Sequence, residues 1–176
     1  MQLTTQRLTI RELTIDDAAF IKALLNTPGF KQNIADRGID TIEKAEKEIT
    51  HRYSSGYPTF GFFAVCLKST SQPVGGVTLI NRDQLDVPDL GYAFLPEFSG
   101  QGYALESTIG LRDWAIENGF PTLCAIVQEE NVKSIALLQR LDFAPKGTKD
   151  LTDPEETLLY FEYTAETKNK GLTNAK

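Results

Sequence analysis

The segment at residues 96–106 reads Pro-Glu-Phe-Ser-Gly-Gln-Gly-Tyr-Ala-Leu-Glu. Its two glycines, Gly100 and Gly102, separate a strand-like run at residues 89–95 from a run with helical periodicity that begins at Tyr103. Glycine permits a sharp turn there and lets an anion approach the backbone amides without a Cβ in the way. The first amides of the helix lack intrahelical acceptors, and the helix dipole adds positive potential. A phosphate or pyrophosphate is therefore a natural ligand of this loop.

A glycine pair before a helix also fits a plain turn, and two familiar phosphate-binding fingerprints do not match it. The Walker loop needs Gly-Lys followed by Ser or Thr, which is absent here. The dinucleotide fingerprint would place its third glycine at Leu105, and it normally opens an early strand–helix–strand unit. Four predicted strands precede this loop, so its function has to be inferred from the elements around it.

Those elements predict one α/β domain over residues 1–163, followed by a disordered tail at residues 164–176, which has almost no apolar content. Predicted strands lie at residues 3–13, 59–67, 74–80, 89–95 and 123–127, near Phe143, and at residues 157–163. The order is β-α-α-β-β-β-α-β-α-β-β. It indicates one mixed, mostly antiparallel sheet of about seven strands with helices on both faces.

Helix boundaries are predicted from capping and stop signals. The first helix follows Thr14 and ends at residues 26–29, Asn-Thr-Pro-Gly. The second begins at Asp40 or Thr41, where Asp40 and Glu43 have the spacing of a capping box. The third runs from Tyr103 to the Asn-Gly pair at residues 118–119. The buried stripe of the second helix is predicted at Ile42, Ala45, Ile49 and Tyr53, and that of the last helix at Val132, Ile135, Leu138 and Leu141.

Composition excludes several classes of protein. The 176 residues carry a net charge of −6, which argues against a general nucleic-acid binder and is compatible with a cationic substrate such as an amine. No apolar run is long enough to cross a bilayer, and residues 1–7 have no apolar signal-peptide core, so a cytoplasmic location is expected. Cys66 and Cys124 are predicted to be buried thiols. No His or Cys spacing, including that around His51, predicts a metal site.

Three segments in order resemble the GNAT acetyltransferases. Residues 99–104 resemble the Gln/Arg-x-x-Gly-x-Gly/Ala cofactor motif, with Ser99 at its first position. Residues 96–106 resemble, more narrowly, the RimJ/RimL-like branch, which includes ribosomal-protein N-terminal acetyltransferases. Residues 5–11 resemble the first strand of that branch, and residues 131–143 its Asn-x-x-Ser…Glu-Lys-x-Gly-Phe helix. Asp142 replaces the usual glycine of that helix exit, so a different backbone is expected there.

The resemblance implies that acetyl-CoA is the co-substrate and that a neutral amine attacks its thioester directly. Main-chain groups of Ala93, Phe94 and Leu95 would bind pantetheine, and an amide there would polarise the thioester carbonyl. The residues that would bind the pyrophosphate through their amides are Gln101, Gly102, Tyr103 and Ala104.

Three residues are the predicted catalytic set. Asn131 is expected to cap the last helix and to contact the cofactor near its thiol end, and Ser134, one turn on, is the candidate proton donor to the thiolate. Glu97 is the candidate base, acting directly or through water. Glu97 and Asp89 both flank the fourth strand, and each also fits a solvated surface acid.

Several residues outside the predicted catalytic set also have expected roles. Tyr92 and Tyr160 could line an acceptor pocket or pack in the core, and Glu106, inside the motif helix, is expected to be structural. The glycines at residues 75–76 predict a bulge or a close approach of another group.

The acceptor stays open among a protein N-terminal amine, a small amine such as a polyamine, amino acid or antibiotic, and none at all if the chain is a non-catalytic acyl-CoA sensor. The segments expected to select the acceptor are residues 28–58, 81–88 and 144–156. No nucleic-acid or membrane partner is expected, and the protein is expected to be a monomer or a homodimer.

Overall fold

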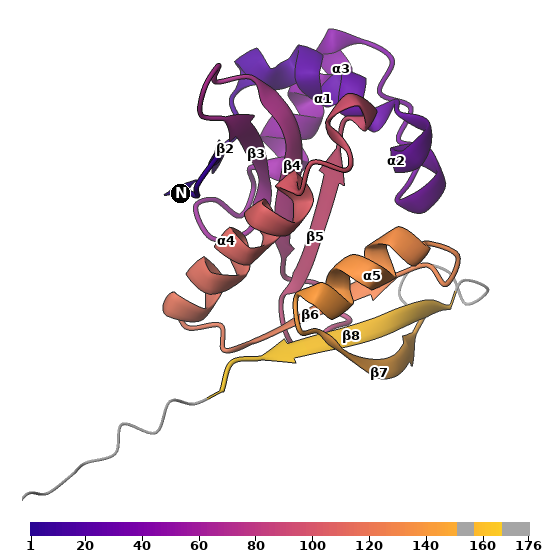
Figure 1. Ribbon diagram of the computed structural model, residues 1–176. Helices are drawn as coiled ribbons and strands as arrows, with labels where there is room; N and C mark the ends of the chain where they lie inside the picture. The colour runs from indigo at the N-terminus through magenta and orange to yellow at the C-terminus, as the bar shows by residue number, and fades with distance from the viewer. Residues whose placement is uncertain (151–156, 167–176) are drawn as a thin grey trace, which may run out of the picture.

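The structure, a computed structural model, describes residues 1–150 and 157–166. Within those residues one eight-stranded sheet has the order β1-β2-β3-β4-β5-β6-β8-β7 (Figure 1). Its strands are β1 (Gln2–Thr4), β2 (Leu8–Glu12), β3 (Gly61–Leu67), β4 (Pro73–Ile80), β5 (Asp89–Phe94), β6 (Thr122–Val127), β7 (Ala144–Lys149) and β8 (Leu158–Thr164). Neighbouring strands are antiparallel except β5 and β6, which are parallel.

Helices cover both faces of the sheet (Figure 1). One face carries α1 (Ala18–Leu25), α2 (Pro28–Asn33) and α3 (Ile42–Glu48), and the other carries α4 (Tyr103–Glu117) and α5 (Val132–Arg140). Each layer of helices buries its own apolar cluster, one around Leu24 and Ile49 and the other around Leu111 and Leu138. The predicted mixed, mostly antiparallel sheet between two helical layers is confirmed.

The prediction of one strand over residues 3–13 is wrong. A turn separates β1 from β2, and it is closed by a hydrogen bond from the Thr5 amide to the Leu8 carbonyl (2.9 Å). This hairpin makes the sheet eight strands wide instead of about seven. The alternation of apolar residues marks this break in the sequence. Leu3 is at an odd position and the buried residues Leu8 and Ile10 are at even positions, so one continuous strand would direct Leu3 to the opposite face.

The region between β2 and β3 holds one α-helix more than predicted, in addition to a 3-10 turn at Ile15–Asp17. Residues 26–29, expected only to stop the first helix, also start α2: the Thr27 hydroxyl accepts from the Phe30 amide (3.3 Å), and Pro28 occupies the first turn. Proline fits the first turn of a helix as well as the end of the preceding one. The α2 helix is anchored because the Phe30 side chain is buried.

The predicted capping box of the next helix is also wrong. Thr41, not Asp40, is the cap, and its hydroxyl accepts from the Lys44 amide (3.2 Å). Asp40 instead pairs with Lys44 Nζ at 2.6 Å, which lowers the pKa of Asp40. The helix continues as a π-helical turn over Ile49–Tyr53. Of its predicted stripe, Ala45, Ile49 and Tyr53 are buried, whereas Ile42 is exposed.

The predicted boundaries of the later helices are confirmed. The α4 helix begins at Tyr103 and ends at Glu117, before the Asn-Gly pair. The α5 helix is capped by Asn131, whose Oδ1 accepts from the Ser134 amide (3.2 Å). In its predicted stripe Leu138 and Leu141 are buried, but Val132 is exposed. The expected change of backbone at Asp142 is wrong, because Asp142 has φ +63°, the left-handed conformation that glycine favours.

The last predicted strand and the last predicted loop differ slightly from the structure. The last strand, β8, begins and ends one residue later than its predicted range of 157–163. Residues 144–149, expected to be part of an acceptor loop, form edge strand β7, and residues 151–156 of that loop lie outside the described residues. The tail from residue 167 also lies outside them. No helix in the described residues is long and apolar enough to cross a membrane.

Candidate active site

The two parallel strands β5 and β6 pair at a single position. Asp89 lies opposite Cys124, and the Cys124 amide donates to the Pro88 carbonyl (2.9 Å). Beyond that point β5 continues along β4 to Phe94, while β6 continues along β8 (Figure 1). We call this divergence the fork. Within the described part of the chain, one edge of β5 beyond Asp89 therefore has no strand neighbour.

The register of β4 and β5 decides which main-chain groups face the fork. The Leu95 amide donates to the Val74 carbonyl (3.0 Å), and Ala93 lies opposite Gly76. Hydrogen-bonded and non-hydrogen-bonded pairs alternate in an antiparallel ladder, so Ala93 and Leu95 direct their backbone groups at β4. Phe94, and Tyr92 before it, direct theirs at the fork. Of the three residues predicted to bind pantetheine through the main chain, only Phe94 has this orientation.

The loop before α4 has the conformation that an anion site requires. Gly100 has φ +76° and Gly102 has φ +81°, both in the left-handed region. The first α-helical bond of α4 runs from the Glu106 amide to the Gly102 carbonyl (3.0 Å), so the amides of Tyr103 and Ala104 have no intrahelical acceptor. Thr27, Thr41 and Asn131 cap their helices with side chains, whereas α4 has no capping side chain. Its first amides remain available to a ligand.

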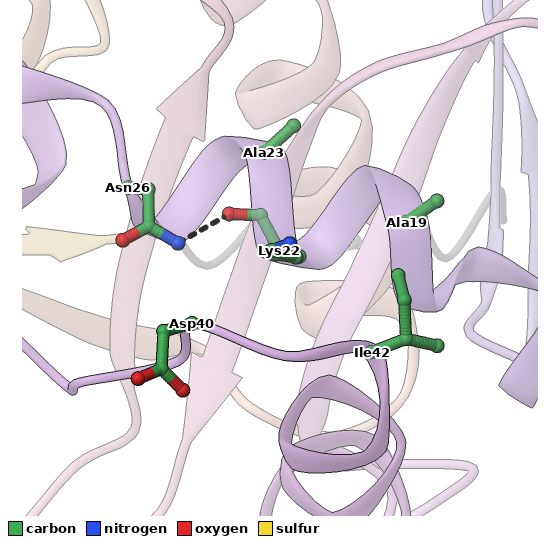
Figure 2. Close-up of a pocket in the computed structure, with 6 residues that line it drawn as sticks. All are labelled: Ala19, Lys22, Ala23, Asn26, Asp40 and Ile42. Atoms are coloured by element: carbon green, nitrogen blue, oxygen red, sulfur yellow. Dashed lines mark hydrogen bonds between the residues drawn. The ribbon is translucent and has the colours of Figure 1, made fainter.

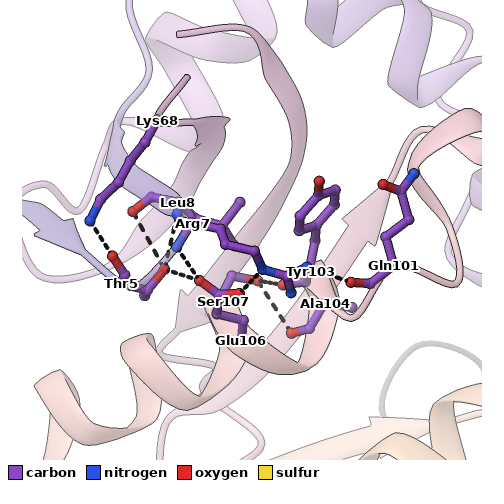
Figure 3. Close-up of polar contacts among 9 residues, drawn as sticks. All are labelled: Thr5, Arg7, Leu8, Lys68, Gln101, Tyr103, Ala104, Glu106 and Ser107. Atoms are coloured by element: carbon purple, nitrogen blue, oxygen red, sulfur yellow. Dashed lines mark hydrogen bonds and ion pairs between the residues drawn. The ribbon is translucent and has the colours of Figure 1, made fainter. Parts of the chain in front are cut away.

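A polar cluster holds this loop in place (Figure 3). Glu106 accepts from Arg7 Nε (2.6 Å), from the Arg7 amide (2.7 Å) and from the Thr5 hydroxyl (2.6 Å). Arg7 Nη1 also donates to the Gln101 carbonyl (2.9 Å), and the guanidinium lies 4.6 Å from the Tyr103 ring centroid. Burial raises the pKa of Glu106, but the hydrogen bonds from Thr5 and Arg7 outweigh it, so the pKa is lowered. The expected structural role of Glu106 is confirmed.

Removal of this carboxylate is expected to loosen the loop. In Glu106→Ala, Arg7 loses its partner, and the loop loses its link to the β1–β2 turn. We expect acetyl-CoA affinity to fall about 10-fold, equal to about 1.4 kcal/mol, by isothermal titration. Glu117→Ala, at an exposed position in the last turn of the same helix, is the control and should bind normally. Normal binding by both variants would show that the cluster does not organise the loop.

The α5 helix carries two of the predicted catalytic residues. Asn131 and Ser134 lie at its N-terminus, tied together by the capping bond. The Ser134 hydroxyl lies 2.9 Å from the Tyr92 hydroxyl on β5. Burial raises the pKa of Tyr92, and the bond to Ser134 partly offsets that rise. Sequence reasoning proposed an acceptor pocket or core packing for Tyr92 and missed this contact, because nothing in either local sequence signals it.

The two candidate bases lie in different environments. Glu97 is exposed in a 3-10 turn (Pro96–Phe98) just before the loop. Asp89 is only 4% exposed and accepts from Arg82 Nε at 2.7 Å, so it is not a solvated surface acid. Burial raises the pKa of Asp89, against the lowering by Arg82. An Asp89 carboxylate held by Arg82 is poorly placed to take a proton from an amine.

Tyr160, the second tyrosine with two predicted interpretations, belongs to a small apolar cluster. Tyr160 is buried with Leu85 and Cys124, and its hydroxyl donates to Glu162 Oε1 (2.9 Å). This packing fits the core interpretation of Tyr160. Cys124 and Cys66 are both buried free thiols, as predicted.

Comparison with known proteins identifies the fold. The GNAT acetyltransferase domain matches residues 7–144, which is more than half of the chain. The chain belongs to the GNAT acetyltransferase family. An acetyltransferase from Agrobacterium tumefaciens str. C58 is 25% identical to this GNAT chain, with a TM-score of 0.78 over 93% of this chain and 94% of that one. No curated protein matches the sequence.

Two further acetyltransferase structures share the fold, one in complex with coenzyme A and the other with acetyl-CoA. RimL, a ribosomal L7/L12 alpha-N-protein acetyltransferase in complex with coenzyme A, has a TM-score of 0.80 at 14% identity, covering 94% of this chain and 98% of its own. The microcin C7 self-immunity acetyltransferase MccE, in complex with acetyl-CoA and AMP, has a TM-score of 0.76 at 16% identity, covering 90% and 93%.

Two glycines in β4 of this GNAT domain leave space for aromatic rings of the neighbouring strands. A Cβ on Gly75 would lie 2.3 Å from Phe94 Cδ1, and one on Gly76 would lie 2.0 Å from Phe62 Cζ. The register of β3 and β4 also shifts beside Gly75, between Val65 and Cys66. The predicted bulge or close approach is confirmed. Gly75 thereby sets how closely Phe94, at the fork, packs against β4.

A surface hollow of about 550 Å³ lies away from these residues, between α1 and the start of α3 (Figure 2). Two of its polar side chains, those of Asn26 and Asp40, already have partners within the protein. Asn26 donates to the carbonyls of Lys22 (2.8 Å) and Ile39 (2.6 Å), and Asp40 pairs with Lys44. It contains none of the predicted catalytic or cofactor-binding residues. Asp40 and Ile42 lie in the segment 28–58 expected to select the acceptor, but we assign the hollow no ligand.

Proposed function

We propose that this GNAT protein transfers an acetyl group from acetyl-CoA to a primary amine by direct attack, with a protein N-terminal amine as the favoured acceptor. The observation that carries the proposal is the fork, with the uncapped N-terminus of α4 beside it. An extended chain with amides can pair with the free edge of β5, and a pyrophosphate can accept from the amides of the glycine loop. Acetyl-CoA has both parts in one molecule.

In this proposal the pyrophosphate accepts from the amides of Gln101, Gly102, Tyr103 and Ala104. Pantetheine pairs with the main chain of Phe94 and Tyr92, the residues whose backbone groups face the fork. Ala93 and Leu95 then support that edge from the β4 side without contacting pantetheine through hydrogen bonds. An amide on the free edge polarises the thioester carbonyl, and a fixed donor of this kind stabilises the negative charge that develops during attack.

The reaction needs one proton removed and one supplied. The amine nitrogen forms a bond to the acetyl carbon, the carbon–sulfur bond breaks, and the nitrogen loses a proton while the leaving thiolate gains one. We assign the proton for the thiolate to Ser134, held at the start of α5 by Asn131. We assign the proton from nitrogen to Glu97 acting through water, because its exposed position leaves it open to solvent.

Two observations bear on the acceptor. The motifs at residues 96–106 and 131–143 support the RimJ/RimL-like branch, and the RimL structure belongs to an enzyme described as an alpha-N-protein acetyltransferase. MccE, an immunity acetyltransferase crystallised with AMP, favours a small-molecule amine as the alternative.

An acceptor screen that reads the release of free CoA thiol tests the proposal. Peptides with free N-termini and small amines are compared side by side, with N-terminally blocked peptides of the same sequence as controls. We expect release with free N-termini and none with blocked ones. Release with small amines alone would move the acceptor to that class. Acetyl-CoA binding without release by any acceptor would contradict the proposal and favour an acyl-CoA sensor.

A further inference from the structure

Two hydroxyl groups meet across the fork. Tyr92 extends from β5, and Ser134 extends from α5, the helix that follows β6, so their 2.9 Å contact joins the two sides of the divergence. Both side chains are half-buried, and Tyr92 also lies against Phe94, with the ring centroids 6.5 Å apart. The contact therefore lies beside the edge to which we assign pantetheine.

The chemistry of the two groups sets the direction of this bond. A phenol is a far stronger acid than an aliphatic alcohol, so the Tyr92 hydroxyl is the better donor and the Ser134 oxygen the better acceptor. The bond between Asn131 and Ser134 runs from the Ser134 amide to Asn131 Oδ1, so it does not involve the Ser134 hydroxyl. With Tyr92 donating, the hydroxyl proton of Ser134 is free to point away from Tyr92 and toward a sulfur atom in the fork.

A serine acting alone is a poor proton donor because it would be left as an alkoxide. The thiol of CoA and the phenol of tyrosine are much closer to each other in acidity than either is to an alcohol. The alkoxide is avoided if Ser134 gains a proton as it gives up its own. The phenol of Tyr92 lies within hydrogen-bond distance of the Ser134 hydroxyl and can supply that proton.

We propose that Tyr92 is a positioning residue that orients the Ser134 hydroxyl and replaces the proton that Ser134 gives to the thiolate. This inference rests on the proposed function. The Ser134 O–H bond breaks as the S–H bond of CoA forms, and the Tyr92 O–H bond breaks as a new Ser134 O–H bond forms. Water then returns a proton to the tyrosinate, and the proton released from the acylated amine balances the cycle.

Tyr92→Phe tests the proposal because it removes the hydroxyl and keeps the ring. We expect its single-turnover rate of acetyl transfer to fall about 10-fold, with the dissociation constant of acetyl-CoA within about 2-fold of wild type. We expect Tyr92→Phe/Ser134→Ala to be no slower than Ser134→Ala, because the two hydroxyls act in series. Tyr163→Phe, on β8 beside Phe143, is the matched control and should keep the full rate.

A proton inventory separates this role from simple packing. In mixtures of light and heavy water the single-turnover rate of the wild type should fall along a bowed line, since two protons move. The line for Tyr92→Phe should be straight, since one proton moves. A straight wild-type line, a full rate in Tyr92→Phe, or independent effects of the two substitutions would overturn the proposal.

The outcome for Ser134 separates this inference from the proposed function. If the single-turnover rate falls in Ser134→Ala but not in Tyr92→Phe, only the role of Tyr92 is rejected. A normal Ser134→Ala would reject Ser134 as the proton donor and the role of Tyr92 with it. Thermal melts of each variant identify any loss of rate that comes from unfolding.

Discussion

Gly102→Asp is expected to abolish acetyl-CoA binding, weakening it by at least about 100-fold, or about 2.7 kcal/mol. Two effects act together. Gly102 has φ +81°, a conformation that costs other residues about 1–2 kcal/mol, and a Cβ there would lie 3.3 Å from Nη2 of Arg7. The new carboxylate would also stand among the amides proposed to hold the pyrophosphate, where repulsion between like charges a few ångströms apart is worth about 4 kcal/mol.

Gly119→Asp separates strain from charge at the ligand. Gly119 also has a left-handed conformation, φ +95°, and a Cβ there would meet nothing within 4 Å. It follows the C-terminus of the same helix, α4, at the end remote from the loop. Isothermal titration with acetyl-CoA should give wild-type affinity for Gly119→Asp and no measurable binding for Gly102→Asp. Equal affinities would remove the loop from the binding site.

The second large effect is expected on stability. Gly76→Ala would place a Cβ 2.0 Å from Cε1 and Cζ of Phe62, a ring that is 2% exposed and packs against Tyr53 at 4.9 Å. The ring is buried and Gly76 lies inside a paired strand, so either group must displace its neighbours to make room. Overpacking of this kind costs about 3 kcal/mol, which for a chain of this size lowers the melting temperature by about 6–12 °C.

A glycine in open space provides the control for this change. A Cβ on Gly29, in α2, would meet nothing within 4 Å, and alanine is the better helix former. Gly29→Ala should therefore melt at or slightly above the wild-type temperature in a calorimetric scan. A Gly76→Ala protein with an unchanged melting temperature would show that the two aromatic rings are not packed as described.

Features encoded locally were predictable from the sequence. The start of α4 at Tyr103 follows from the two glycines before it, and its end follows from the Asn-Gly pair at residues 118–119. Asn131 is recognisable as a cap because it is followed by a periodic apolar run. Each of these signals lies within a few residues of the structure it specifies, so no knowledge of the tertiary fold was needed.

Features that depend on distant contacts were missed or assigned incompletely. Arg7 meets Glu106 across 99 positions and Tyr92 meets Ser134 across 42, and no local pattern pairs them. The orientation of the main chain at Phe94 depends on the register with β4, which follows from the sheet and not from the residue types. Asp89 is buried, and it lies opposite Cys124 of β6, a neighbour 35 positions along the chain.

In the proposed function, acetyl-CoA binds along the free edge of β5 and at the amides at the start of α4. Amide chemical shifts recorded by NMR during a titration with CoA test it most directly. We expect the largest changes at Gly102, Tyr103, Ala104 and Phe94, and small changes around the hollow beside Lys22. Changes concentrated at that hollow, with the loop and the fork unaffected, would contradict this mode of binding.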